Sequence, residues 1–306
     1  MKKICLGTAL WGWSVNKNEA FAIMDQFYDA GYRHVDTANN YPMNGLAESY
    51  QKSAHYISEW CKYNNVKDLK ITYKIGSLSN TFVIENNLSP KFLKNQISHA
   101  NSIFSNNLHC LMIHWDNRDD LKSIEETLFF LNSFCSNNKL SMGLSGIKNI
   151  QIYRDLLYEM KISNINIQLK HNFLFSDLNK YAFLSGLNPR IWAYGISMGG
   201  IKLTENEYNH KSYVPLTKGI NYHKKIISPE IESMLQDIVK NNDIINNIYH
   251  LAIIFSEQEN SLYGYNIAPS KLSQMKDLNE FFIRLDIATV NSIKLSKLKK
   301  LLKYAK

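Results

Sequence analysis

The chain has 306 residues, a hydrophobic fraction of 45% and a formal net charge of +8. It is long for an average domain, and a chain of this size can bury a large core without disulfide or metal support. The segment from Met1 to Cys5 lacks the apolar run of a signal peptide. No window approaches the roughly 20 apolar residues that span a bilayer. We therefore expect neither secretion nor membrane insertion.

The basic balance is compatible with nucleic acid, a membrane surface or a small anionic ligand as partner. Its largest cluster, residues 294–303, has leucines at helical spacing, which favours a surface helix with a solvated lysine face. We expect no nucleic-acid or membrane partner. Four scattered cysteines without metal-ligand spacing predict reduced thiols, a cytoplasmic protein and no metal site. The abundance of asparagine, lysine and isoleucine throughout indicates a bacterial source.

Strand and helix patterns alternate along the whole chain. Short β-branched and apolar segments predict strands, and capped periodic segments between them predict helices. The expected strands are residues 4–7, 34–36, 69–75, 108–114, 141–144, 165–169, 190–194 and 261–263. The expected helices are residues 18–30, 47–63, 89–104, 120–136, 150–160, 178–184, 228–257 with a break near 241–242, and 269–282.

Eight strand–helix units without a composition break predict a parallel sheet in one domain, residues 1–306. The sheet can close into a (β/α)8 TIM barrel or stay open and doubly wound. An open dinucleotide fold carries G-x-G-x-x-G after its first strand, and the segment from Gly7 to Gly12 lacks that spacing. This difference favours the barrel. The long irregular segment 199–227 is typical of a functional loop or lid.

Four polar residues follow the expected strands in a pattern that suits carbonyl reduction. Asp36, Lys74 and His114 lie at or near carboxyl ends of strands, where barrel enzymes place their chemistry, and Tyr41 follows in a loop. A lysine ammonium makes a nearby phenol a better acid, an aspartate holds that lysine, and a neutral histidine orients a carbonyl oxygen. Each residue alone is also compatible with a structural role, such as a helix cap or a snorkelling lysine. Together they predict Tyr41 as general acid.

Three segments carry a family resemblance. The segment from Gly31 to Tyr41 resembles the aldo-keto reductase signature, in which an aspartate precedes the catalytic tyrosine by five positions. Residues 71–74 are similar to the strand with the family lysine, and residues 111–115 to the strand ending in the family histidine. The resemblance implies a (β/α)8 barrel that reduces an aldehyde or ketone with NAD(P)H. It gives the catalytic tetrad to Asp36, Tyr41, Lys74 and His114.

The same resemblance implies a nicotinamide cofactor, with NADP(H) as the family default and NAD(H) as the alternative. Ser145 and Gln168 are expected to hold the nicotinamide amide, although Gly146 replaces the family's asparagine. Tyr194 is expected to stack on the ring, and the loop after the last strand to receive the adenosine half. The expected cofactor-binding residues are Gly7, Thr8, Ala9, Asp36, Ser145, Gln168, Tyr194, Gly195, Ile196, Ser197, Met198, Gly264, Tyr265, Asn266, Ser270 and Lys271.

Trp11, Trp13 and Trp115 lie just beyond strand ends and are expected to line the substrate pocket. The short segment 116–120 favours a more open pocket that can take a larger or polar small-molecule carbonyl substrate, such as a sugar or nucleotide-linked sugar. Two other functions stay open. A non-catalytic barrel that senses nicotinamide nucleotides would explain Gly146, and an unrelated barrel lyase or isomerase would bind no nicotinamide.

Overall fold

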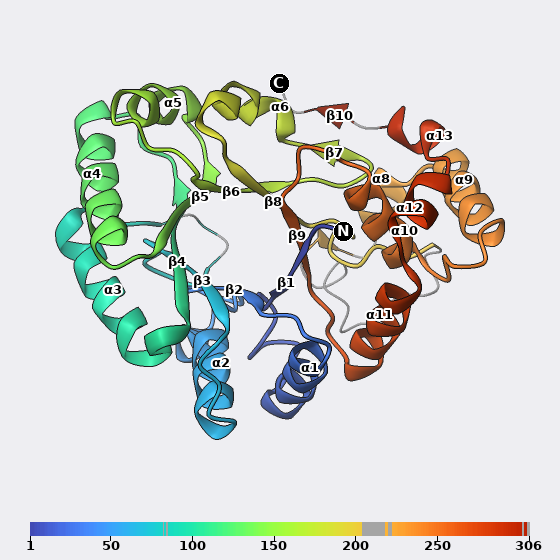
Figure 1. The fold of residues 1–306 in the computed structure, drawn as a ribbon, viewed down its shortest axis with the longest axis horizontal. Coiled ribbons are helices and arrows are strands. Elements are labelled where there is room, and N and C mark those ends of the chain that lie inside the picture. Colours follow the sequence, from blue (N-terminus) through green and yellow to red (C-terminus); the bar gives the residue numbers. More distant parts are fainter. Residues whose placement is uncertain (82, 84, 204–217, 220–221, 302, 305–306) are drawn as a thin grey trace.

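The computed structural model describes the 306-residue chain except residues 82, 84, 204–217, 220, 221, 302, 305 and 306. Eight parallel strands form a closed barrel, and the helices surround it (Figure 1). The predicted (β/α)8 barrel is confirmed, and the open doubly wound sheet is excluded. The barrel strands are, in order around the ring, β1 (Lys3–Gly7), β2 (His34–Ala38), β3 (Lys70–Ile75), β4 (Leu108–Asp116), β5 (Ser141–Ile147), β6 (Asn166–Lys170), β8 (Arg190–Tyr194) and β9 (Gly264–Ile267).

The connections between the strands are mainly helical, and a short two-stranded sheet lies outside the barrel. The helices are α1 (Lys17–Asp29), α2 (Lys52–Tyr63), α3 (Pro90–Phe104), α4 (Leu121–Asn137), α5 (Ile150–Glu159), α6 (Leu178–Tyr181), α8 (Tyr222–Ile226), α9 (Pro229–Lys240), α10 (Ile248–Glu257), α11 (Leu272–Arg284), α12 (Ile287–Ser292) and α13 (Ser296–Lys299). Single 3-10 turns are η1 (Ala47–Ser49), η2 (Ser105–Asn107) and η3 (Ala182–Leu187), and β7 (Phe175–Ser176) pairs with β10 (Lys303–Tyr304).

Local sequence signals explain where several helices begin. Ser89 accepts a hydrogen bond from the Phe92 N–H at the start of α3, and Pro90 occupies the first turn. Ser228 and Pro229 open α9 in the same way. The predicted break in the long helical stretch is confirmed, because α9 ends at Lys240 and α10 begins at Ile248.

Two predicted elements are wrong. The last barrel strand is β9, three residues later than expected, because Glu259 holds a turn: its carboxylate accepts hydrogen bonds from the N–H and hydroxyl of Ser261. The helix expected over residues 294–303 is reduced to the four residues of α13, because the chain turns after Lys299. The expected lid, residues 199–227, falls largely outside the described residues.

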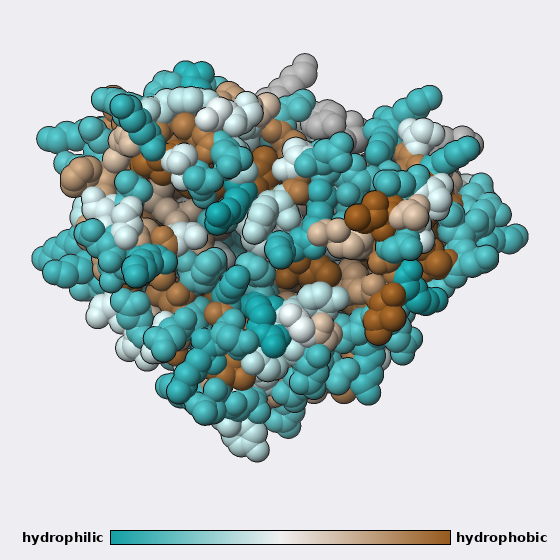
Figure 2. All heavy atoms as spheres, viewed as in Figure 1, coloured by the Kyte–Doolittle hydropathy of each residue, from teal (hydrophilic) through white to brown (hydrophobic). Residues whose placement is uncertain are grey.

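The hydrophobic core lies between the strands and the surrounding helices, whereas the inside of the barrel carries a polar layer. Alternate residues of a strand face opposite sides, so Asp36, Lys74, Ser145 and Gln168 point inward while their neighbours pack under helices. Most of the face shown in Figure 2 is hydrophilic, with hydrophobic residues in separate patches. Within the described ranges, no helix is long and apolar enough to cross a membrane.

Candidate active site

The four expected catalytic residues come together at the carboxyl end of the barrel. Lys74 on β3 donates to the carboxylate of Asp36 on β2, and both side chains are buried. The Lys74 ammonium lies 4.7 Å from the centre of the Tyr41 ring. The Tyr41 and His114 rings meet edge to face with their centres 5.9 Å apart. A phenol, an ammonium, a carboxylate and an imidazole therefore share one small volume.

Burial and neighbouring charges set the protonation states of this site. Burial alone would lower the pKa of Lys74, but Asp36 and then Tyr41 outweigh it, so the pKa of Lys74 is raised. Burial and, after it, the Lys74 charge hold the pKa of His114 well below its ordinary value. At neutral pH the site thus combines a charged lysine with a neutral imidazole.

Gln168 on β6 joins the expected cofactor residues to this catalytic group. Its Nε2 donates to Asp36 Oδ1 at 2.8 Å, and its Oε1 accepts from the Ser145 hydroxyl at 3.3 Å. The family resemblance gives Gln168 a role toward the nicotinamide alone. The contact with Asp36 was not predicted, because the two residues lie 132 positions apart in the sequence.

Trp115 explains why glycine stands at position 146. The Trp115 indole stacks on the His114 ring with a centre distance of 4.2 Å. A Cβ added to Gly146 would collide with this indole, and the φ angle of Gly146 is +70°. Trp115 itself has a φ of +58°, an uncommon value for a bulky residue. The Trp115 indole therefore fills the space that the side chain of the family's asparagine would need at position 146.

A buried polar cluster just beyond Trp115 was missed by the sequence analysis. The Asp116 carboxylate accepts hydrogen bonds from the Arg118 guanidinium and from the Tyr153 hydroxyl. Arg118 also donates to the Ser123 carbonyl, which ties the turn after β4 to α4. The only sequence signal was an arginine two residues after a strand-end aspartate. This cluster fixes the chain that carries His114 and Trp115.

Residues after β1 serve mainly structural purposes. The Thr8 hydroxyl donates to the Asp36 carbonyl and accepts from the Ser53 hydroxyl, so this side chain ties β1 to β2. The expectation that Trp11 lines the substrate pocket is wrong, because its indole is 1% exposed and packs in the core. Trp13 and Trp115 are half-buried. Gly7 and Ala9 lie at the carboxyl end of β1.

The expectation that Gly264, Tyr265 and Asn266 form a loop around the adenosine half is also wrong, because all three lie within β9. Gly264 pairs with Lys3 at the amino end of the barrel, and the Tyr265 hydroxyl points outward to Glu257. The loop that follows β9 begins at Ala268 and contains Ser270 and Lys271, which remain candidates.

The turn after β8 has an unusual backbone conformation. Gly195, Met198, Gly199 and Gly200 all have positive φ angles. Across the described segments, the N–H groups of Ile196, Ser197 and Gly199 donate to no backbone carbonyl. Backbone N–H groups in a turn of this kind can bind phosphate oxygens. Tyr194, exposed by 37%, ends the strand that leads into this turn.

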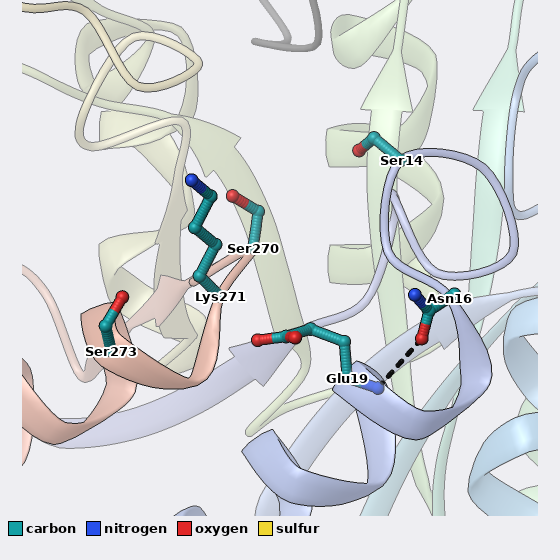
Figure 3. Close-up of a pocket in the computed structure, with 6 residues that line it drawn as sticks. All are labelled: Ser14, Asn16, Glu19, Ser270, Lys271 and Ser273. Carbon is teal, nitrogen blue, oxygen red and sulfur yellow. Dashed lines mark hydrogen bonds between the residues drawn. The ribbon is translucent and has the colours of Figure 1, made fainter.

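A pocket of about 340 Å³ lies between the start of α1 and the start of α11 (Figure 3). Ser270 and Lys271 point into it from one wall, opposite Ser14. The Glu19 carboxylate turns toward α11, where it accepts a hydrogen bond from the Leu272 N–H. The pocket therefore combines a lysine and hydroxyl groups with one carboxylate.

These residues fit a nicotinamide dinucleotide at three points. Ser145 and Gln168 lie beside the expected catalytic residue Asp36, and Tyr194 ends β8. The turn at residues 195–200 offers backbone N–H groups, and the pocket at the start of α11 offers Lys271. The one feature that does not fit is Gly146, where an amide donor is missing.

Comparison with known proteins agrees with the fold and with the family resemblance. The family model described as Aldo/keto reductase family matches residues 3–295. The probable aryl-alcohol dehydrogenase AAD4 of Saccharomyces cerevisiae is 28% identical over 142 residues, which are 43% of this chain and 40% of the yeast protein. The oxidoreductase P32A8.02 of Schizosaccharomyces pombe is 34% identical over 67 residues, 21% of this chain and 22% of that protein.

The aldo-keto reductase AKR11C1 from Bacillus halodurans, solved in its holo form, superposes with a TM-score of 0.72 at 16% sequence identity. The alignment covers 99% of this chain and 93% of that one, which shows that the two share a fold. The matched segments span less than half the length of the yeast relatives. With a family match that covers almost every residue, the chain belongs to the aldo/keto reductase family.

Proposed function

We propose that the chain is a single-domain, NADP(H)-dependent reductase of aldehydes or ketones in which Tyr41 is the general acid. The observation that carries this proposal is the position of Lys74, buried between the Asp36 carboxylate and the Tyr41 ring. A buried ion pair costs desolvation energy and adds little to stability. Its placement against a half-buried phenol is explained by proton transfer.

Ser145, Gln168 and Tyr194 would hold a nicotinamide, which when bound would supply a hydride to the carbonyl carbon. The Tyr41 hydroxyl gives its proton to the carbonyl oxygen, so the carbonyl becomes an alcohol and the cofactor is oxidised. The neighbouring Lys74 ammonium stabilises the phenolate that remains, and Asp36 keeps that ammonium in place. The neutral His114 orients the carbonyl oxygen through a hydrogen bond.

The rings around Tyr41 favour an aromatic carbonyl compound over a sugar. Trp115 stacks on His114, and His114 meets Tyr41, so one wall of the site is a row of flat aromatic rings. Such surfaces bind an aryl group through its face or edge. The names of the Saccharomyces cerevisiae relatives support the same substrate class. We therefore propose an aryl aldehyde as substrate and an aryl alcohol as product.

Lys271 and Ser270 favour NADP(H), because an ammonium and a hydroxyl suit a 2′-phosphate. Glu19 opposes this preference, since its carboxylate already occupies the N-terminus of α11 and repels a phosphate. NAD(H) thus remains the second candidate cofactor. Four free, buried cysteines suit a reducing compartment, which supports the cytoplasm as location.

The test is a titration with NADPH and NADH, followed by quenching of tryptophan fluorescence, together with turnover of a panel of aryl aldehydes, ketones and sugars. The proposal expects saturable binding of NADPH and oxidation of NADPH by an aryl aldehyde. Binding without any turnover would indicate the nicotinamide sensor instead. Failure to bind either nucleotide would overturn the proposed cofactor and the reductase activity with it.

A further inference from the structure

A second group of basic residues lies at the opposite, amino-terminal mouth of the barrel. Lys3, His34, Lys70 and Arg190 are the first residues of β1, β2, β3 and β8, and His109 is the second residue of β4. The amino ends of parallel barrel strands meet at one mouth, so these five side chains share one rim. In Figure 1 the N-terminus marks this end of β1, inside the ring of helices.

Ring contacts connect three members of the group, His34, His109 and Arg190. The His34 ring lies 6.2 Å from the His109 ring and 5.3 Å from the Trp192 ring, centre to centre. Trp192 meets Tyr263 at 5.2 Å, and the Arg190 guanidinium lies 5.7 Å from the same Tyr263 ring. The largely buried Trp192 donates from Nε1 to Asn166 Oδ1 and forms the floor of the mouth.

The permanent cations of this mouth are Lys3, Lys70 and Arg190. Among the residues that the structure describes, no carboxylate forms an ion pair with Lys3, Lys70 or Arg190. The carboxylate of Asp68 pairs with Arg33, and the charges of Glu257 and Glu259 act on Lys2.

The pKa values of His34 and His109 are both lowered, by burial and in part by the cations of this mouth. Burial, followed by the charges of Lys70, His109 and Lys3, lowers the pKa of His34 to about 4. Burial, then Lys70 and Arg190, lowers the pKa of His109. Both imidazoles are neutral at pH 7, so each can donate one hydrogen bond and can take up a proton when an anion arrives.

We infer that the amino-terminal mouth of the barrel, formed by Lys3, His34, Lys70, His109 and Arg190, binds a phosphate dianion, either as inorganic phosphate or as the phosphate group of a monoester. Lys3, Lys70 and Arg190 carry permanent positive charges, which suit a doubly charged oxyanion. The Arg190 guanidinium also offers paired donors to the phosphate oxygens. The Trp192 floor keeps the ligand at the rim, at the other end of the barrel from Tyr41. The site does not depend on the proposed reductase activity.

The experiment titrates the full chain with inorganic phosphate and with phenyl phosphate at constant ionic strength, by calorimetry and by NMR of the histidine rings. Saturating NADPH fills the nucleotide site; if NADPH does not bind, Lys271→Gln removes that site's cation instead. We expect one saturable phosphate site and a rise in the pKa of His34 and His109. Tighter binding of inorganic phosphate assigns the free ion, and tighter binding of phenyl phosphate assigns a monoester.

The deciding variant is Lys3→Gln/Lys70→Gln, which changes two exposed side chains and leaves the core intact. Each lost charge should weaken phosphate binding at least about fivefold, the value for two unit charges about 4 Å apart in water, because the phosphate carries two charges. The matched control is Lys91→Gln/Lys94→Gln, the same charge change on exposed positions of α3. Equal weakening in the control, unchanged binding in the deciding variant, or no saturable site would overturn the inference.

Discussion

The side-chain amide of Gln168 donates to Asp36 Oδ1 at 2.8 Å and so connects the expected nicotinamide site to the lysine–aspartate pair. Asp36 holds Lys74 through its other carboxylate oxygen, Oδ2. The Asp36 carboxylate therefore accepts one hydrogen bond from Gln168 in the expected nicotinamide site and one from Lys74 beside Tyr41. A change at Gln168 is expected to affect both cofactor binding and proton transfer.

Gln168→Leu tests this connection. The variant removes the donor to Asp36 and leaves the carboxylate free to shift, so we expect kcat to fall about 10- to 100-fold. The dissociation constant of NADPH should rise as well. Stopped-flow measurement of NADPH oxidation and fluorescence titration would report the two effects. Asn166→Leu is the control, because Asn166 lies on the same strand but contacts Trp192; an equal loss of kcat there would count against the connection.

Substitutions of the Asp36–Lys74 pair should change stability and activity in different ways. Lys74→Met leaves a buried carboxylate without its cation, so we expect the free energy of unfolding to fall by about 3–5 kcal/mol. Asp36→Asn/Lys74→Met removes both charges and should regain most of that stability in urea titrations. Both variants should lack activity. If the double variant is no more stable than Lys74→Met, the pair is not coupled in the way the structure indicates.

Gly146→Asn restores the residue that the family resemblance expects, and its effect should depend on Trp115. Asparagine tolerates a positive φ, so the main cost is the collision with the indole, about 1–3 kcal/mol. Combining Gly146→Asn with Trp115→Ala should remove the collision and tighten NADPH binding through the added amide. Thermal melts and NADPH titrations check both points. Additive effects of the two substitutions would show that the residues do not compete for space.

His171 gives the protein an acid-sensitive stability. Burial lowers its pKa to about 4, whereas the unfolded chain binds a proton near pH 6.5. The resulting stabilisation is complete above pH 6.5 and is lost as the pH falls toward 4, by up to about 3 kcal/mol. Urea titrations between pH 7 and 4 should show a shallower loss in His171→Asn. The exposed His55→Asn is the control; identical slopes in all three proteins would contradict this account.

Much of the fold could be predicted because its signals are local. Short segments of the sequence are enough to identify helix caps such as Ser89 and Ser228. The same holds for the alternation of strand and helix patterns. The strand ends then placed Asp36, Lys74 and His114 together. The last strand was misplaced because a side chain, that of Glu259, sets the turn before it.

Relations between distant residues could not be predicted. Tertiary packing decides whether the glycine at position 146 leaves part of the cofactor site unfilled or makes room for the Trp115 indole. The same holds for the donor from Gln168 to Asp36 and for Trp11, whose indole turned into the core. The position of residues at strand ends predicts which side chains can meet there. It does not predict which of those side chains already contact another residue.

The central claim is that Tyr41 delivers the proton, and Tyr41→Phe tests it most directly. The variant keeps the ring against His114 and Lys74 but removes the hydroxyl. We expect kcat for NADPH-dependent reduction of a responsive aryl aldehyde to fall at least about 100-fold, as is typical when a general acid is lost. NADPH affinity should be unchanged. Reduction at the full rate by Tyr41→Phe would contradict the assignment of Tyr41 as general acid.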